Sequence, residues 1–515
     1  MTYFDTTLKM YNYMNRKHVI LATILTAGAM LMSCGDDKNT PDTPDTPSTP
    51  QEPTTGDVRV LTTTANRSKE LAQSWIDFSK SDNMSPSTIR LVPSEEFQTM
   101  DGFGAAITGS TCYNLMRMKP EDRKEFLTTT FSPDNGYGFS YVRISIGCSD
   151  FSLSEFTCCD KEGIENFALT SEDTGYVIPV LKEILDINPD LKIMGTPWTA
   201  PRWMKVNNLT DLKPHNGWTS GQLNPKYYAD YGEYFVKWIQ AMEAAGVPIY
   251  SVTPQNEPLN RGNSASMYMG WEEERDFIKN GLGPALKKAG LNTKVYAFDH
   301  NYNYDNMADQ KGYPTNIYKD EEAKQYLDGA AYHNYGGDKE ELTVVHNATP
   351  GMDLVFTETS IGTWNDGQNL DKRLTDDMEQ VALGTVNRWC KGVIVWNLML
   401  GEDSDGKYGP YRPGGCSTCY GAVDINRNYT KMTKNSHYYI IAHLSSVVQP
   451  DAVRIGTKGF TANGLTYTAF KNPDGSYAVV ASNSSSSDIK ATIDDGSHHF
   501  PVTVPARSAV SFSWK

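Results

Sequence analysis

The chain has little positive charge for its length. Of its 515 residues, 47 are Lys or Arg and 62 are Asp or Glu, which gives a formal net charge of −15. Proteins that bind nucleic acids need a basic face for the phosphates, so this balance argues against a nucleic-acid partner and against a strongly anionic substrate. A neutral partner fits better, and 29 Tyr and 10 Trp residues supply aromatic surface for it.

The N-terminal part also lacks an apolar run long enough for a stable membrane span. The run at 19–32 is shorter than the roughly 20 residues that a spanning helix needs. Because Lys9, Arg16 and Lys17 precede it, residues 1–33 are predicted to be a secretory signal. The residues "LMSC" that end it resemble a bacterial lipobox, which predicts a lipid on Cys34; the alternative is an incidental Cys after an ordinary signal.

Residues 34–56 have few apolar side chains and cannot form a core. The stretch "TPDTPDTPSTPQEPTT" (40–55) is rich in Pro and predicts an extended tether. The acidic residues at 35–39 resemble a tract that directs some bacterial lipoproteins to the cell surface. We therefore expect a monomer on the outer membrane, held there only through the lipid at Cys34.

Cysteine is scarce and metal-ligand spacing is incomplete. Without Cys34, seven of the 8 Cys residues remain, so at least one thiol is expected to be free or buried. Cys416 and Cys419 have the spacing of half a zinc site, but no second pair accompanies them, which leaves a local disulfide or two unpaired thiols. Residues 403–406 likewise lack the remaining ligands of a calcium loop.

The length of the chain favours one large domain and a smaller one. Short apolar runs alternate with segments of helical character, such as 227–246, which is the pattern of a parallel sheet built from βα units. Eight such units predict a (β/α)8 TIM barrel over residues 99–442. The expected strands are 100–107, 141–147, 191–198, 249–257, 294–300, 329–335, 353–359 and 392–400.

Both ends of the folded part show strands that alternate with turn signals. The C-terminal residues 443–515 include the strand-like runs 465–470, 476–482 and 508–514. Two further runs, 57–64 and 87–93, precede the barrel. We predict that residues 57–98 add strands to the C-terminal domain, so that an antiparallel β-sandwich is assembled from both ends of the chain.

Polar and aromatic residues repeatedly end the predicted barrel strands. In such a barrel the reacting groups come from the C-terminal ends of the strands, so these side chains converge on one cleft. The residues are Arg143, Asp150, Trp198, Asn256, Glu257, Asp299, His300, His333, Tyr335, Glu358, Trp396 and Asn397.

Glu257 and Glu358 follow the apolar strands four and seven, where exposure to solvent does not explain an acid. Barrel closure brings these strand ends to opposite sides of one pocket. Paired carboxylates suit cleavage of a glycosidic bond, because one protonates the leaving oxygen and the other attacks the anomeric carbon. The tryptophans at strand ends supply flat apolar faces that stack on sugar rings.

These residues stand in motifs that resemble glycoside hydrolase family 30, a clan A family of retaining β-glycosidases that includes glucosylceramidase, xylanases and endo-β-1,6-glucanases. The motifs are "DGFGAAIT", "VRISIGCSDFS", "GTPWTAPRWMK", "VTPQNEP", "AYHNY", "VFTETS" and "WNLML", from about residue 59 onward.

The resemblance implies a role for each residue of the predicted site. Glu257 would be the general acid/base and Glu358 the nucleophile, with retention of configuration, and Asn256 would bond the sugar 2-hydroxyl. The other implied sugar-binding residues are Arg143, Asp150, Trp198, His333, Tyr335, Trp396 and Asn397. The resemblance implies a barrel with a β-sandwich and no cofactor or metal.

The expected substrate is a neutral β-glucan. Asp150 and Trp198 resemble members that hold a glucosyl unit, and endo-β-1,6-glucanase is favoured because a surface lipoprotein is well placed to cut a soluble polymer. Glucosylceramidase or exo-acting β-glucosidase is the alternative, and residues 401–415 are expected to decide between them. A glycan-binding lipoprotein without catalysis would lack a carboxylate, yet both are present.

Overall fold

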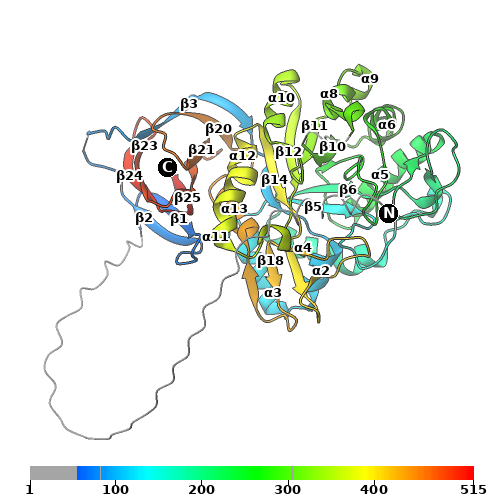
Figure 1. Ribbon diagram of the computed structural model, residues 1–515, viewed down its shortest axis with the longest axis horizontal. Helices are drawn as coiled ribbons and strands as arrows, with labels where there is room; N and C mark the ends of the chain where they lie inside the picture. The colour runs from blue at the N-terminus through cyan, green and yellow to red at the C-terminus, as the bar shows by residue number, and fades with distance from the viewer. Residues whose placement is uncertain (1–54, 82, 303–306) are drawn as a thin grey trace, which may run out of the picture. The chain divides into compact units, whose positions relative to one another are not determined.

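The computed structural model describes residues 55–81, 83–302 and 307–515. Eight parallel strands form one sheet in the order β4-β14-β12-β11-β10-β9-β6-β5, and a parallel bridge between Ala106 and Arg143 joins its two edges. The (β/α)8 prediction is therefore confirmed (Figure 1). The strands are β4 Gly102–Ala105, β5 Tyr141–Ile146, β6 Lys192–Pro197, β9 Ser251–Val252, β10 Lys294–Asn301, β11 Gly329–His333, β12 Asp353–Glu358 and β14 Cys390–Val395.

The side chains of the barrel strands form an apolar layer below a polar one. Tyr141, Met194, Ala331 and Val355 belong to one apolar cluster contributed by several strands. Alternate residues of a strand share a face. The residues two positions later therefore point to the same side of the sheet and form the next layer along the barrel. Those residues are Arg143, Thr196, His333 and Thr357, which are polar and hydrogen-bonded to one another or to Asp299.

Helices accompany the strands on the outside of the barrel (Figure 1). Short π-helical turns at Asp173–Val177, Ile278–Leu282 and Met378–Ala382 precede or join helices, as between α6 and α7. The helices are α2 Gly109–Arg117, α3 Pro120–Phe131, α4 Ile178–Ile187, α5 Tyr228–Ala244, α6 Trp271–Phe277, α7 Gly283–Ala289, α8 Tyr313–Ile317, α9 Glu321–Lys324, α10 Glu340–Ala348, α11 Leu370–Asp377, α12 Leu383–Val386 and α13 Ser436–Ser445.

Most barrel strands are shorter than predicted; β4, for example, covers Gly102–Ala105 instead of 100–107. The fourth, β9, is regular only at Ser251–Val252, because Pro254 and Pro258 lack the amide hydrogen that a strand ladder uses. The eighth, β14, ends at Val395, and Met399–Glu402 begins a separate small sheet as β15. Its partners are β16 Tyr408–Gly409, β18 Val423–Ile425 and β19 Met432–Lys434.

The sandwich is one nine-stranded sheet in the order β2-β1-β25-β22-β21-β20-β3-β23-β24. N-terminal strands, blue in Figure 1, lie among C-terminal strands drawn in orange and red. The predicted assembly from both ends is confirmed, although β2, β20, β23 and β24 were not predicted. The strands are β1 Val58–Thr64, β2 Ala72–Ile76, β3 Thr88–Thr99, β20 Val453–Gly459, β21 Leu465–Lys471, β22 Tyr477–Asn483, β23 Ile489–Asp494, β24 His499–Val504 and β25 Ser508–Trp514.

Helix α13 connects the barrel to the sandwich. The buried ring of His443 lies between Thr63 and Ser511, with nitrogen–oxygen distances of 2.9 and 2.8 Å. The predicted domain boundary at residue 442 falls inside this helix, which ends at Ser445. No helix in the described ranges is long and apolar enough to span a membrane. The predicted signal at 1–33 and Cys34 lie outside the described residues, as does the predicted tether apart from residues 55 and 56.

Candidate active site

Glu257 and Glu358 reach the site from different strands and both are buried. Glu358 is the last residue of β12, while Glu257 follows β9 with a φ of 43°. Asp299 and Asn397 also have positive φ angles, 54° and 56°. Such angles are costly for residues other than glycine and persist where the surrounding structure holds them, which is typical of functional sites.

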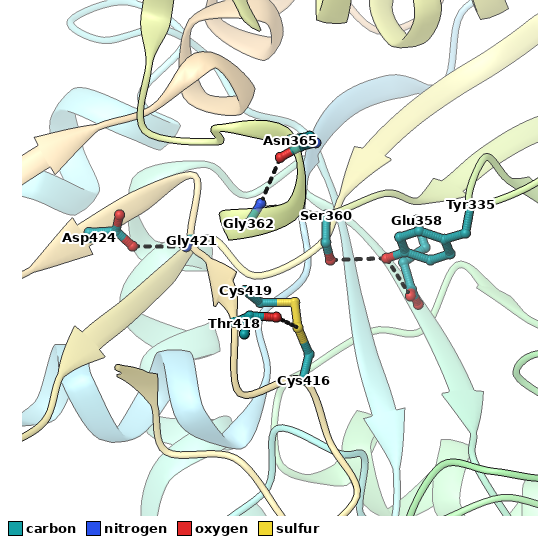
Figure 2. Close-up of a disulfide and its surroundings, with 10 residues drawn as sticks. All are labelled: Tyr335, Glu358, Ser360, Gly362, Asn365, Cys416, Thr418, Cys419, Gly421 and Asp424. Atoms are coloured by element: carbon teal, nitrogen blue, oxygen red, sulfur yellow. Dashed lines mark hydrogen bonds between the residues drawn. A yellow bond between two sulfur atoms is a disulfide. The ribbon is translucent and has the colours of Figure 1, made fainter. Parts of the chain in front are cut away.

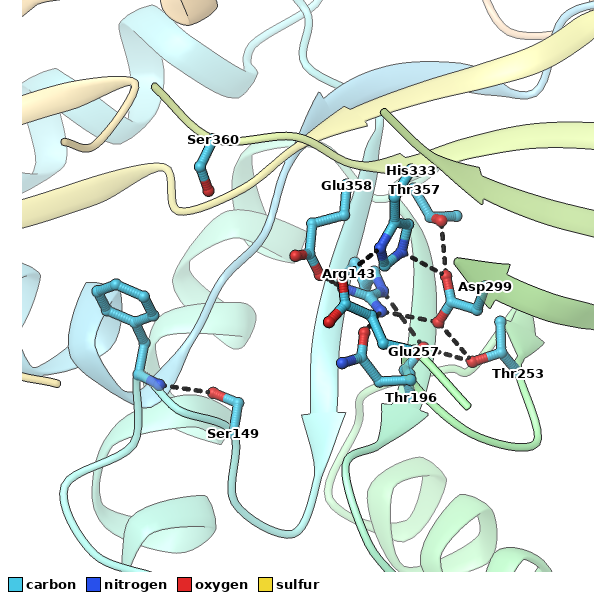
Figure 3. Close-up of polar contacts among 12 residues, drawn as sticks. Arg143, Ser149, Thr196, Thr253, Glu257, Asp299, His333, Thr357, Glu358 and Ser360 are labelled. Atoms are coloured by element: carbon cyan, nitrogen blue, oxygen red, sulfur yellow. Dashed lines mark hydrogen bonds and ion pairs between the residues drawn. The ribbon is translucent and has the colours of Figure 1, made fainter. Parts of the chain in front are cut away.

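Arg143 is the centre of the cluster. Its fully buried guanidinium donates from Nη1 to Glu358 Oε2 at 2.6 Å. From Nη2 it donates to Asn256 Oδ1 and to Asp299 Oδ2, both at 2.7 Å. The fork of donors on one guanidinium fixes three side chains from three strand ends, and Figure 3 shows it close to Glu358, Glu257 and Asp299.

We expect Arg143→Met to lower the free energy of unfolding by about 3 kcal/mol, because it leaves the buried carboxylates of Asp299 and Glu358 without their cation. Urea denaturation measures the effect. The matched control is Arg123→Met, which removes a peripheral ion pair to Glu183 and is expected to cost less than about 1 kcal/mol. Equal losses for the two variants would contradict this account.

His333 lies between two carboxylates. Its Nδ1 is 3.3 Å from Glu257 Oε1, and its Nε2 is 3.0 Å from Asp299 Oδ1 (Figure 3). A neutral imidazole has only one N–H, so donation to both acids requires the charged form. Burial opposes that charge, but the negative charge of Glu358 and the hydrogen bonds to Asp299 and Glu257 raise the pKa of His333 to about 9.

The raised pKa of His333 predicts a loss of stability in alkaline solution. The charged ring stabilises the fold fully below the ordinary pKa of about 6.5, and this contribution is lost as the pH rises through about 9. The shift corresponds to about 3 kcal/mol. We expect urea midpoints of the wild type to fall toward those of His333→Gln between these pH values, whereas His215→Gln on a peripheral loop should follow the wild type. Parallel curves for the wild type and His333→Gln would contradict the assignment.

The two glutamates titrate as parts of one cluster. Burial would raise the pKa of Glu257, but the hydrogen bond from His333 and the nearby His300 and His333 rings lower it to about 2. Burial raises the pKa of Glu358, and the charge of Glu257 adds to this, while His333 and Arg143 oppose it. These directions are the reverse of those that an acid at 257 and a nucleophile at 358 require. The protonated group next to Glu257 is His333, whose pKa is raised to about 9.

Asp299 was placed at a strand end by the sequence but given no role. Burial works against its charge, yet Arg143 first, and then His333 and Thr357, hold the pKa of this carboxyl well below its usual range. It also accepts from Thr253 Oγ1 at 2.8 Å. A bulge between Phe298 and His300 in the pairing of β10 with β11 turns it toward the cluster.

Two tryptophans cover the guanidinium of Arg143. The rings of Trp198 and Trp396 are 5.3 Å apart at 30°, and the Arg143 carbon lies 4.9 and 5.6 Å from their centres. Both side chains are almost fully buried. They form an aromatic wall beside the carboxylates, in the place that the sequence predicted.

Asp150, Asn397 and Tyr335 complete the predicted set. Burial and the charges of Glu358 and Glu257 raise the pKa of Asp150 to about 8, so this carboxyl is protonated at neutral pH. The buried Asn397 Nδ2 has no hydrogen-bond partner among the described residues, which leaves a donor for a ligand. Tyr335, a residue that is 43% exposed, donates from its hydroxyl to Glu358 Oε1 at 3.0 Å.

A disulfide joins Cys416 to Cys419 beside this set (Figure 2), which decides between the two predicted alternatives. The Cys416 backbone lowers the pKa of Asp150 through a hydrogen bond, and the Arg412 amide donates to the Asp150 carbonyl at 2.7 Å. Arg412 of the segment 401–415 thus contacts Asp150, while the expected role of this segment in substrate choice stays a prediction. The buried free thiols, whose presence was predicted, are Cys112, Cys148, Cys158, Cys159 and Cys390.

Glu257, His300 and His333 are close enough to hold a metal ion, since one potential ligand atom of each lies within 4.8 Å of the others. Both nitrogens of His333, however, already contact carboxylates. Burial lowers the pKa of His300 to about 4, so this ring is neutral at pH 7. A metal ion at this place would therefore have to displace the hydrogen bonds that His333 makes to Glu257 and Asp299.

A barrel of this kind with buried paired glutamates, an arginine fork and an aromatic wall is the construction of a glycoside hydrolase. Residues 100–448 match the model of the glycosyl hydrolase family 30 TIM-barrel domain, and residues 451–512 match that of the family 30 β-sandwich domain. The chain belongs to glycoside hydrolase family 30.

Relatives of known activity share most of the chain. An endo-1,6-β-D-glucanase of Neurospora crassa is 32% identical over 427 residues, covering 79% of this chain and 83% of the relative. The lysosomal acid glucosylceramidase of Mus musculus is 27% identical over 456 residues, covering 83% of each. Among solved structures, the endo-β-1,6-glucanase BT3312 is 63% identical with a TM-score of 0.86, covering 89% of this chain and 99% of that one.

Proposed function

We propose that this chain is a retaining endo-β-1,6-glucanase, with Glu358 as the nucleophile and Glu257 as the general acid/base. The observation that carries the catalytic assignment is the joining of two buried glutamates from strand ends four and seven through Arg143, Asp299 and His333. The linkage is supported by the similarity to endo-β-1,6-glucanases.

The reaction proceeds in two displacements. Glu358 attacks the anomeric carbon while Glu257 gives a proton to the glycosidic oxygen, which leaves with the rest of the chain. Glu257 is then ionised and takes a proton from water as that water attacks the glycosyl–Glu358 ester. Two inversions at the same carbon return the sugar to its original configuration.

The charges of the cluster suit the positive charge that develops on the sugar in the transition state. Arg143 and His333 are cationic, whereas Glu257, Asp299 and Glu358 are acids; Asp150 is neutral at pH 7. With Glu358 ionised, as its contact with Arg143 favours, the five charged groups leave one negative charge in excess. A neutral glucan enters such a site without bringing a charge that the site must compensate.

His333 supplies the proton that Glu257 delivers. The proton on Nδ1 lies along a 3.3 Å contact to Glu257 Oε1, and its transfer leaves both groups neutral. A substrate that excludes water from the site favours the neutral pair, because a low dielectric penalises separate charges. His333 is therefore a positioning and proton-holding residue, and Asp299 keeps its ring in place.

Hydrolysis of four substrates tests the proposal: β-1,6-glucan, β-1,3-glucan, xylan and glucosylceramide. We expect reducing sugar from β-1,6-glucan, with mid-length oligosaccharides as early products because cleavage is internal. Release of glucose alone would mean exo action. Cleavage of glucosylceramide or aryl glucosides without cleavage of any glucan would establish the alternative, which the glucosylceramidase relatives favour. No cleavage of any substrate would favour a glycan-binding protein.

We also propose that the chain is a monomer attached to the outer membrane by a lipid on Cys34 and displayed at the cell surface. The lipobox-like residues before Cys34 and the Pro-rich stretch after it support this. Cys34→Ala is expected to move the protein from the membrane fraction to the soluble fraction. An unchanged membrane fraction would count against the anchor.

A further inference from the structure

Trp364 is an exposed aromatic side chain close to the site in sequence. It lies on the short helical turn Thr363–Asn365, six positions after Glu358, and is 47% exposed. A chain of six residues spans at most about 20 Å, which sets an upper limit on its distance from the nucleophile. Exposure on this scale is unusual among the large apolar side chains of the described residues, most of which are buried.

The Trp364 indole packs against the backbone of Gly362. A Cβ atom built on Gly362 would lie 1.9 Å from Cζ3 and 2.4 Å from Cη2 of Trp364, so the six-membered ring lies directly against this glycine. No other residue type allows so close an approach. The indole therefore rests on Gly362, while the residue as a whole is 47% exposed.

The segment that carries Trp364 is tied to the catalytic cluster. Ser360 bonds the hydroxyl of Tyr335 at 2.9 Å, and that hydroxyl contacts Glu358 (Figure 2). Gly362 N–H donates to Asn365 Oδ1 at 3.0 Å, which closes the turn around the tryptophan.

The disulfide hairpin fixes the same segment from the other side. Strand β13 (Ile361–Gly362) pairs with β17 (Cys419–Tyr420), and the Thr363 amide donates to the Thr418 carbonyl at 3.0 Å. Because Cys416 also contacts Asp150, the hairpin connects the predicted sugar pocket to the turn that presents Trp364.

We propose that Trp364 is a sugar-binding platform at the mouth of the cleft and that the Cys416–Cys419 hairpin positions its indole. The platform forms a subsite for a glucosyl unit other than the one whose glycosidic bond is cleaved. The flat, partly exposed indole suits the C–H face of a pyranose ring. This inference rests on the proposed function, because the subsite is useful only for a substrate that is a chain of several glucosyl units. A lipid glucoside with a single sugar has no unit to place there.

Oligosaccharide binding to Glu358→Gln, with and without Trp364→Ala, tests the platform. Titrations with β-1,6-, β-1,3- and β-1,4-gluco-oligosaccharides of increasing length would be followed by calorimetry. In the linkage series that binds, Trp364→Ala is expected to weaken the longer members about tenfold, equivalent to about 1.4 kcal/mol. It should leave the binding of a single glucoside unchanged. Trp364→Tyr should keep most of the increase in affinity with oligosaccharide length, because tyrosine also presents an aromatic face.

The outcomes separate this inference from the proposed function. If the β-1,6 series does not bind but another series gains affinity through Trp364, the linkage is wrong and the platform is supported. If Trp364→Ala behaves like the control Trp75→Ala on β2 in every series, the platform is overturned. In the double variant Cys416→Ser with Cys419→Ser, affinity should rise less with oligosaccharide length than in the parent protein. An undiminished rise in affinity would overturn the role of the hairpin.

Discussion

Glu358→Gln is expected to reduce turnover by at least about 10⁴-fold on both β-1,6-glucan and aryl β-glucosides, because glutamine keeps the shape of the side chain but cannot form the glycosyl ester. The loss should be equal for good and poor leaving groups, since no substrate can bypass the missing nucleophile. Steady-state rates on the two substrates measure it. The contact with Arg143 can persist through the amide oxygen, and the amide nitrogen can donate to the hydroxyl oxygen of Tyr335, so the fold should be retained.

The stereochemistry of rescue provides the control for Glu358. In Glu358→Ala, azide can occupy the space of the lost carboxylate and attack the anomeric carbon from that side, which gives a glucosyl azide of inverted configuration. A product of retained configuration, or turnover by Glu358→Gln within about tenfold of wild type, would show that another group is the nucleophile.

Glu257→Ala is expected to separate substrates by their leaving groups. Loss of a general acid costs about 10²–10⁴-fold where the leaving oxygen needs a proton, as in β-1,6-glucan. An aryl glucoside with an acidic phenol leaves without that help, so its first step should be nearly unaffected. The covalent intermediate should then accumulate, because the base that activates water is also missing. A burst of phenol followed by a slow steady rate is the measurement.

The matched variant for Glu257 is Asn260→Ala. Asn260 Nδ2 donates to Glu257 Oε2 at 2.6 Å, so its removal changes the environment of the carboxyl without removing it. We expect similar, small losses on glucan and aryl glucoside from Asn260→Ala. With azide added, Glu257→Ala should give a glucosyl azide of retained configuration, because azide attacks the covalent intermediate without needing a base. Equal losses on both substrates from Glu257→Ala, with neither a burst of phenol nor this azide product, would contradict the acid/base assignment.

Much of the architecture follows from local sequence. The eight apolar runs, each followed by helical periodicity, predict the barrel because parallel strands buried on both faces need continuous apolar residues. Glu257 and Glu358 could be selected for the same reason, since an acid that ends a buried strand has no structural explanation. The strands of the sandwich that alternate clearly, such as β22 and β25, were predicted for their period of two, whereas β20, with Gly456 and Lys458, has a weaker pattern.

Other parts of the site depend on contacts between distant segments. Asp299 became the partner of Arg143 and His333 through a bulge in strand pairing, which no local pattern of residues specifies. Thr196 and Thr357 could have been found from alternation, because each lies two positions after a residue of the apolar layer. The protonation of His333 required knowledge that two carboxylates flank one ring.

The sequence by itself determined the fold class, the two glutamates and the family, because buried strands and motif order are local properties of the chain. Only the tertiary structure decided how these groups are charged and held. Arg143 neutralises acids from two other strand ends, His333 carries the proton next to Glu257, and the Cys416–Cys419 hairpin reaches Asp150. Charge and proton affinity depend on burial and on distances of a few ångströms between segments far apart in the chain, which only the closed barrel creates.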